Sequence, residues 1–160
     1  MADFVEEIER FLASFSPEEN TLSRHAFRAL LDGQPATVAE LPAALGLPPA
    51  VVEAAVENLT KRGTMVVESD TGRIVGVRGL SLVEANHRFI LEGRELYAWC
   101  AVDAVGIPAA LGADARVDSH CHHCRAPLTL ELKGGTVEAP DGLVIWAVER
   151  DLTRSLRTHT

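Results

Sequence analysis

Residues 95–127 read ELYAWCAVDAVGIPAALGADARVDSHCHHCRAP, and they decide the interpretation of the whole chain. They contain all three cysteines of the sequence, Cys100, Cys121 and Cys124, and histidines surround the last two. A cytosolic protein keeps its cysteines reduced and uses them as metal ligands or nucleophiles more than as disulfides. The stretch is therefore either a site for a soft metal or a packed helix followed by an accidental C-x-x-C.

A helix is expected to begin near Leu96 and to end by Gly112, with Pro108 disturbing its last turn. Cys100 and Asp103 lie three residues apart on this helix, which puts both side chains on one face. A thiol and a carboxyl in one partly buried site can act as nucleophile and proton donor. The alternative is that Cys100 only packs in the core, as free cysteines often do.

The motif HCHHC at residues 120–124 is a C-x-x-C pair with histidines around it. Two thiolates suit a soft or borderline metal, but a closed zinc site needs four ligands and the sequence has no second C-x-x-C. The candidate metal ligands are Cys100, Cys121, Cys124, His120 and His123. The alternative is a hairpin tip with solvated histidines. A thioredoxin-like redox role is disfavoured because no βαβ unit is visible.

The second half of the chain, residues 79–160, predicts a small mixed domain with an antiparallel sheet. Its strand-like runs are HRFIL, ARVDSH, PLTLEL and GLVIWAV. The segments CHHCRA and KGGTVEAPD separate the last three of them. Together with the expected helix, these strands make an α+β core that carries the Cys/Asp/His cluster.

The first half, residues 1–78, predicts a helical domain. Apolar spacing indicates helices at about residues 3–15 and about residues 21–31. A short helix from near Thr37 to Gly46, a second helix that stops at Gly63, and the hairpin TMVVE–SDTG–RIVGV then follow in the order of a winged helix. The expected fold class is therefore α+β, with a winged-helix-like domain before the mixed domain.

Composition limits the possible partners. The formal net charge is −8, and residues 37–62 carry three acidic and two basic side chains. Both observations argue against binding to the phosphates of nucleic acids. No apolar run reaches the ~18 residues of a membrane span. The acidic start MADFVEEIER does not read as a signal peptide, so a cytoplasmic location is expected. The sequence has no P-loop, dinucleotide-binding, serine-hydrolase or H-E-x-x-H motif.

The segment LYAWCAVDAVGIPAALGADARVDSHC closely resembles the core of bacterial organomercurial (alkylmercury) lyases. In that family a Leu-Tyr-Ala-Trp-Cys-Ala-x-Asp stretch is followed by Pro-Ala-Leu-x-Gly and then by Ala-Arg-Val-x-Ser-His-Cys. The similarity extends back through GRIVGVRGLSL and covers roughly residues 37–146. The resemblance implies the lyase fold and a protonolysis that converts R–Hg–X into R–H and Hg(II).

The resemblance also implies roles for individual residues. Cys100 matches the first catalytic cysteine of the family, and Asp103 matches the aspartate that supplies the proton. Thiolate is the softest ligand that a protein offers to the soft Hg(II) ion. Cys121 matches a family cysteine that looks structural. The family's second catalytic cysteine follows the strand that matches GLVIWAV, whereas here no cysteine follows Cys124, which stands where relatives have a small residue.

Two functions of different classes follow from this departure. The first is a minimal organomercurial lyase in which Cys124 or Cys121 supplies the second thiol; Cys124 is favoured to share mercury with Cys100, because a hairpin tip gives it reach. The second is a non-catalytic relative of the lyase fold that binds a thiophilic or borderline metal such as zinc, as a sensor or a sequestering module. In both cases the expected partner is a small organometal or a metal ion. No cofactor is required, and Hg(II) is product or ligand.

Overall fold

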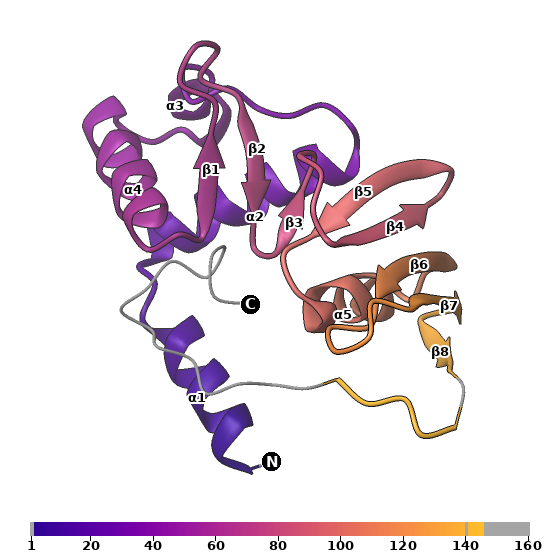
Figure 1. Ribbon diagram of the computed structural model, residues 1–160. Helices are drawn as coiled ribbons and strands as arrows, with labels where there is room; N and C mark the ends of the chain where they lie inside the picture. The colour runs from indigo at the N-terminus through magenta and orange to yellow at the C-terminus, as the bar shows by residue number, and fades with distance from the viewer. Residues whose placement is uncertain (1, 140, 146–160) are drawn as a thin grey trace.

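The computed structural model describes residues 2–139 and 141–145. Helices form most of the first half and an antiparallel sheet runs through the rest, which confirms the α+β class (Figure 1). The elements are α1 (Ala2–Ala13), α2 (Pro17–Leu31), α3 (Leu41–Leu45), α4 (Pro49–Lys61), β1 (Met65–Val67), β2 (Ile74–Val77), β3 (Leu80–Ser81), β4 (His87–Leu91), β5 (Arg94–Ala98), α5 (Ala101–Leu111), β6 (Ala115–His120), β7 (Pro127–Lys133) and β8 (Thr136–Glu138). Among the described residues, no helix is long and apolar enough to cross a membrane.

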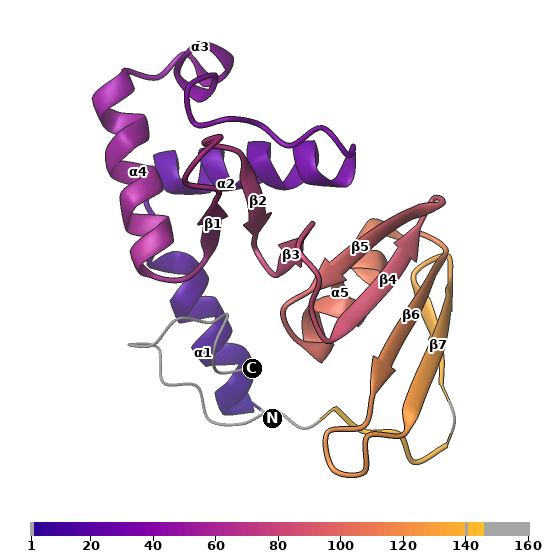
Figure 2. The same cartoon turned by 45° about the horizontal axis from the view of Figure 1, so that its top comes forward.

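One sheet connects the two halves of the chain. Its strand order is β1-β2-β3-β5-β4-β6-β7-β8. The short strand β3 pairs with β2 on one side and with β5 on the other, and Figure 2 shows it between the β1–β2 hairpin and the β4–β5 hairpin. The boundary expected after residue 78 therefore falls between two strands of one sheet. The division into domains 1–78 and 79–160 stays a prediction.

The second helix begins earlier than expected, at Pro17 rather than near Thr21. Ser16 caps it: its hydroxyl oxygen accepts the N–H of Glu19 at 3.1 Å, and the Glu19 carboxylate accepts the N–H of Ser16 at 2.8 Å. This reciprocal capping box stabilises the first turn. The S-x-x-E spacing of this capping box is present in the sequence and marks the true helix start. The predicted start rested on apolar periodicity alone.

The elements α2, α3, α4, β1 and β2 follow in the order that a winged helix requires (Figure 1). The expected short helix is shorter than predicted, because Thr37 forms a bridge with Arg73 and α3 begins only at Leu41. The β1–β2 hairpin lies where the TMVVE and RIVGV runs predicted it. The winged-helix classification itself stays a prediction.

The expected helix start near Leu96 is wrong. Residues 94–98 form strand β5, which pairs along its whole length with β4. Glu92 and Gly93 have φ values of 49° and 79°, the left-handed conformations that a tight two-residue hairpin turn needs. Helix α5 begins only at Ala101, and it ends before Gly112 as predicted.

Helix α5 covers one face of β4, β5 and β6 (Figures 1 and 2). Successive side chains of a strand point to opposite faces, so every second residue of these strands faces the helix. The buried side chains on this face are Phe89, Leu91, Leu96, Ala98, Ala115 and Val117. They belong to one core cluster with Ala104 of α5 and with Leu22 of α2, so the sheet that carries α5 is packed into the same core as the helical half.

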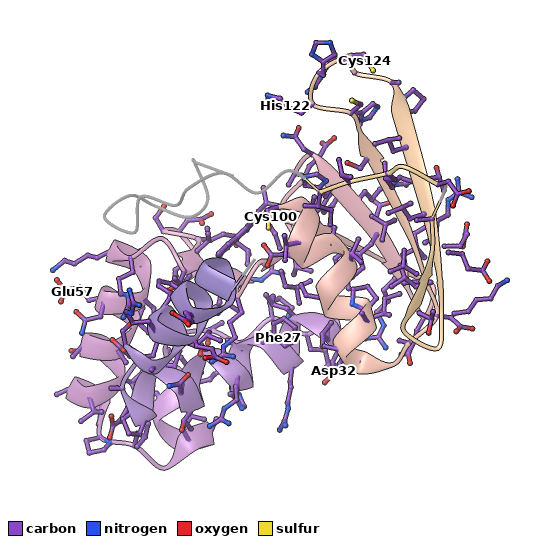
Figure 3. All side chains as sticks on the ribbon, turned by 90° about the horizontal axis from the view of Figure 1, so that it is seen from below. Phe27, Asp32, Glu57, Cys100, His122 and Cys124 are labelled. Carbon is purple, nitrogen blue, oxygen red and sulfur yellow. The ribbon has the colours of Figure 1, made fainter. Side chains whose placement is uncertain are left out.

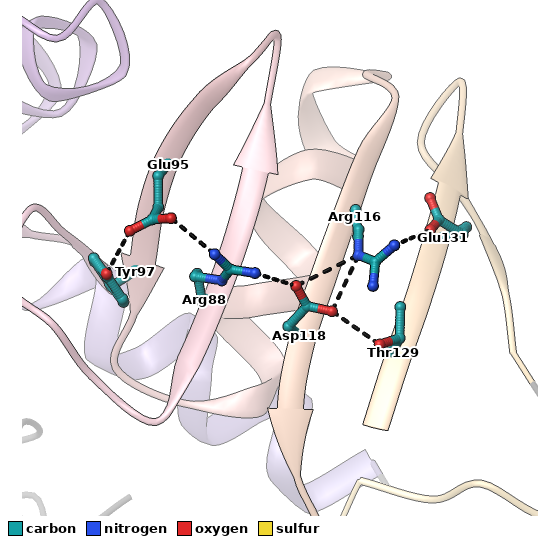
Figure 4. Close-up of polar contacts among 7 residues, drawn as sticks. All are labelled: Arg88, Glu95, Tyr97, Arg116, Asp118, Thr129 and Glu131. Carbon is teal, nitrogen blue, oxygen red and sulfur yellow. Dashed lines mark hydrogen bonds and ion pairs between the residues drawn. The ribbon is translucent and has the colours of Figure 1, made fainter. Parts of the chain in front are cut away.

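The opposite face of these strands carries a chain of ion pairs (Figure 4). Arg88 of β4 bonds Glu95 of β5 at 2.8 Å and Asp118 of β6 at 2.7 Å, and Arg116 continues the chain to Glu131 of β7 at 3.8 Å. Most of these side chains are about half exposed, so each pair contributes little to stability. Their positions opposite one another favour the observed register of the four strands.

The strand expected at GLVIWAV, residues 142–148, is not present in its described part. Residues 143–145 belong to no strand, and residues 146–148 lie outside the described residues. Instead β8 forms within the KGGTVEAPD segment that was expected to be a connection, and it pairs with β7 after a Gly134–Gly135 turn.

Candidate active site

The candidate site lies at the N-terminus of α5, where Cys100 is the N-cap residue. Its backbone is extended, with φ −142° and ψ 169°, and its sulfur accepts the N–H of Asp103 at 3.4 Å. The two side chains are in contact, as predicted, but for a different reason. They are not on one face of a continuous helix. Instead, the cap residue and the third helical residue face each other, as in a capping box.

The thiol of Cys100 also donates a hydrogen bond to Oδ2 of Asp103, at 3.0 Å. Only 8% of Cys100 is exposed. Burial, the nearby negative charge of Asp103 and this hydrogen bond together raise the pKa of the Cys100 thiol to about 12, although N–H groups of Asp103 and Val102 act in the opposite direction. At neutral pH the Cys100 thiol is therefore protonated, and its hydrogen bond is directed at the carboxyl group of Asp103.

A glycine makes room for this carboxylate. Gly79, in the turn between β2 and β3, has φ +83°, and a β-carbon there would lie 2.6 Å from Oδ2 of Asp103 and closer still to the rest of the carboxyl group. Its carbonyl oxygen accepts the N–H of Trp99 at 2.9 Å, which ties this turn to the residue before Cys100. Gly79 is thus part of the wall that holds Asp103. The sequence prediction missed it, although it lies in the GRIVGVRGLSL stretch that carries the family resemblance.

Arg78 anchors the same turn from the helical half. It is a non-glycine residue with φ 53°. Its guanidinium donates to Oγ of Ser23 at 2.9 Å and to Oδ1 of Asn20 at 2.8 Å, both on α2. A residue held in the left-handed region needs such fixed surroundings. Helix α2 therefore helps to set where Gly79, and with it Asp103, lies.

A histidine lies at the same end of the sheet. His87, the first residue of β4, is opposite Ala98 of β5 in the register and so points to the α5 face; Ala98 lies two residues before Cys100 in the sequence. Its Nδ1 is 2.8 Å from Oγ of Ser119 on β6, and burial lowers the pKa of His87. No spacing in the sequence singled out this pair, because the contact depends on the pairing of β4 with β6.

A cavity of about 230 Å³ lies beside the residue that precedes the candidate cysteine. Its lining residues are Val66, Ser81, Val83, Glu84, Ala85, Asn86 and Trp99. Trp99 packs against Gly76, where an added β-carbon would lie 3.1 Å from the indole ring. Neither Cys100 nor Asp103 is among the lining residues, so this cavity is not the site of the thiol–carboxylate pair.

The other candidate ligands lie in the connection between β6 and β7. Figure 3 shows Cys124 and His122 at the tip of this hairpin, away from Cys100. Cys124 is exposed and Cys121 is half-buried, so neither side chain is enclosed in the core. His120 and His123 are exposed.

The structure therefore divides the predicted site residues into two groups. Cys100 and Asp103 form one, and Cys121 and Cys124 form the other. In residues 2–139 and 141–145, no three His, Cys, Asp or Glu side chains are grouped so that they could hold a metal ion. In this part of the chain, no single ligand set is formed by Cys100, Cys121, Cys124, His120 and His123. The reason is that strand β6 leads to the hairpin tip, so the histidines and the C-x-x-C lie there, away from Cys100.

The fold and the thiol–carboxylate pair define a class: an α+β protein with a buried cysteine at a helix N-terminus beside an acid. Comparison with known proteins shows which family within this class the chain resembles. A family model described as alkylmercury lyase matches residues 80–159. The chain is 30% identical to the alkylmercury lyase of Bacillus cereus over 139 residues, which is 86% of this chain and 62% of that protein. It is 40% identical to the alkylmercury lyase of Pseudomonas putida over 115 residues, 71% of this chain and 52% of that protein.

A solved structure described as the mercury-bound form of MerB2 superposes with a TM-score of 0.85 at 32% identity, covering 94% of this chain and 73% of that one. The chain belongs to the alkylmercury lyase family. It spans less than two thirds of the length of the curated relatives named above.

Proposed function

We propose that the chain carries out carbon–mercury protonolysis with Cys100 as the mercury-binding thiol and Asp103 as the proton carrier. The observation that carries this proposal is the 3.0 Å hydrogen bond from the Cys100 thiol to the Asp103 carboxylate. It supplies, in one contact, the sulfur that binds the metal and the proton that the carbon needs. Membership in the alkylmercury lyase family supports the same assignment.

The first step exchanges a ligand on mercury. The sulfur of Cys100 bonds to the metal of R–Hg–X, X⁻ leaves, and the thiol proton moves to Asp103. A free thiol with a pKa of about 12 is a poor nucleophile at neutral pH, so removal of its proton must accompany binding. The hydrogen-bonded carboxylate is the base in place for that transfer.

The second step breaks the carbon–mercury bond. The carboxylic acid form of Asp103 gives its proton to the carbon, R–H leaves, and Hg(II) stays on the sulfur of Cys100. The two electrons of the carbon–mercury bond go to the new carbon–hydrogen bond, so no oxidant or reductant is needed. Asp103 returns to a carboxylate, which can accept the next thiol proton.

The metal needs a further thiolate. With only one sulfur, mercury bonded to carbon is in a stable two-coordinate state, and a second soft ligand makes the carbon easier to protonate. Within these 160 residues the last cysteine is Cys124, which lies at the hairpin tip away from Cys100. For these 160 residues assayed alone, a small-molecule thiol from the medium is the proposed second ligand during cleavage.

The test is hydrocarbon release from a phenylmercury compound in the presence of excess small thiol. The expected result is benzene from the unmodified chain and none from Cys100→Ser, with both proteins folded by circular dichroism. Mercury binding without benzene from the unmodified chain would overturn the proposal. That result would favour the alternative of a non-catalytic metal-binding relative.

A further inference from the structure

The hairpin tip at residues 121–126 is a closed turn. The N–H of Cys121 donates to the carbonyl oxygen of Ala126 at 2.8 Å, and the N–H of Arg125 donates back to the carbonyl oxygen of Cys121 at 2.9 Å. Arg125 has φ 60°, which reverses the chain after Cys124. These two bonds hold the C-x-x-C in one compact loop at the ends of β6 and β7.

Polar groups of the turn lie around one sulfur. The backbone N–H of Cys124, the backbone N–H of His123 and the side chain of Cys124 are the groups that act on the pKa of the Cys121 thiol. These groups favour the thiolate and lower the pKa of Cys121, in contrast to the raised pKa of Cys100. The geometry that supports a shared site is the closed turn itself, because its two backbone hydrogen bonds hold both cysteines of the C-x-x-C on one short loop.

The two sulfurs are also accessible. Cys124 is exposed, Cys121 is half-buried, and residues 122–126 are all exposed. Figure 3 shows the tip at the far end of the hairpin from the body of the protein. A dissolved ion can therefore reach this pair without passing the buried Cys100.

The number of donors selects the kind of metal. Zinc in a structural site takes four protein ligands. The described residues offer no group of three His, Cys, Asp or Glu side chains, at the tip or elsewhere. A soft ion that two thiolates satisfy in a linear arrangement, such as Hg(II) or Cu(I), is the better match, and membership in the alkylmercury lyase family favours Hg(II).

We propose that Cys121 and Cys124 form a second Hg(II) site at the hairpin tip, separate from the Cys100–Asp103 site. Binding replaces both thiol protons: one Hg(II) and two thiols give one S–Hg–S unit and two protons. No redox step is involved. The origin of the ion as the product released at Cys100 rests on the proposed function, but binding of Hg(II) at the tip does not.

The experiment removes Cys100 so that only the tip can bind mercury. The Cys100→Ser variant is titrated with mercuric chloride under reducing conditions, in the presence of a competing monothiol. Bound mercury is counted by native mass spectrometry and free thiols by a colorimetric reagent. The expected result is one mercury per chain, loss of both remaining thiols, and an ultraviolet thiolate-to-mercury absorption band.

The matched controls are the double variants Cys100→Ser/Cys121→Ser and Cys100→Ser/Cys124→Ser. Both tip positions have solvent access, so a serine there leaves the fold intact. Each is expected to retain less than a tenth of the mercury at the same competitor concentration. The proposal is overturned if Cys100→Ser holds no more mercury than the double variants, or if mercury joins two chains rather than the two cysteines of one chain.

This outcome is separable from that of the proposed function. If Cys100→Ser binds mercury at the tip and the unmodified chain releases no benzene, the tip site stands and the lyase activity does not. If benzene is released and the tip retains no mercury, only the tip site is refuted.

Discussion

The substitution Gly79→Ala tests how tightly Asp103 is held. The new β-carbon would lie 2.6 Å from Oδ2, whereas ordinary contacts begin near 3.4 Å, so the carboxyl or the turn must move by at least about 0.8 Å. A displacement of about 1 Å in a reacting group costs on the order of 10²-fold in rate, or about 2.7 kcal/mol of barrier. We expect a loss of that size in hydrocarbon release from phenylmercury.

Gly93→Ala is the matched control. Gly93 has φ +79°, close to the +83° of Gly79, but no atom lies within 4 Å of its added β-carbon. Both variants should lose about 1–2 kcal/mol of unfolding free energy from the left-handed backbone, measured in urea. Only Gly79→Ala should lose activity. Moving Asp103 away also removes two of the causes that raise the pKa of Cys100, so Cys100 in Gly79→Ala should alkylate faster at a given pH. Equal turnover by the two variants would refute the steric argument.

Three further predictions follow from other features of the chain. In a Cys121→Ser/Cys124→Ser background, alkylation of Cys100 should be slow at pH 9 and rise towards pH 12, because its pKa is raised from 9.0 to about 12 in the folded protein. An alkylation rate that levels off near pH 9 would contradict the raised pKa of Cys100. The protonated thiol should contribute its full share to the unfolding free energy below pH 9 and lose it between pH 9 and pH 12. Ser16→Ala should lower the unfolding free energy by about 1 kcal/mol, because it removes the cap of α2; an unchanged urea midpoint would show that the capping box is not formed in solution. The helical half should give no tight complex with duplex DNA when the full chain, whose net charge is −8, is tested in a low-salt gel shift; tight, salt-sensitive binding would refute this.

Much of the fold could be predicted from the sequence, because many of its elements are specified by residues close together in the chain. The SDTG segment between two β-like runs predicted the β1–β2 hairpin, and Gly112 marked the end of α5, where it has φ 62°. The strand β5 was misassigned because ELYAWC has a residue composition that suits a strand or a helix. Its conformation is decided by pairing with β4, a contact that is not encoded in the spacing of its own residues.

The candidate site was predictable only in part for the same reason. Cys100 and Asp103 were found because a three-residue spacing brings side chains together at a helix N-terminus as well as within a helix. Gly79 was missed because the β2–β3 turn brings it against Asp103, and the His87–Ser119 contact was missed because it depends on the pairing of β4 with β6. The separation of Cys124 from Cys100 depends on the direction of the β6–β7 hairpin, which no local pattern sets.

A single-turnover comparison of the unmodified chain with Asp103→Asn shows whether Asp103 supplies the proton that reaches the carbon. Each protein is mixed with less than one equivalent of phenylmercury and excess small thiol, and protein-bound mercury and benzene are measured in the same samples. The asparagine side chain keeps the size of the carboxyl but has no acidic proton to give. We expect Asp103→Asn to bind the organomercurial more slowly, because it lacks the base that takes the Cys100 proton, and we expect that, once mercury is bound, only the unmodified chain releases benzene at an appreciable rate. Equal benzene release from Asp103→Asn would contradict this role of Asp103, since the carbon would then take its proton from solvent or from another group.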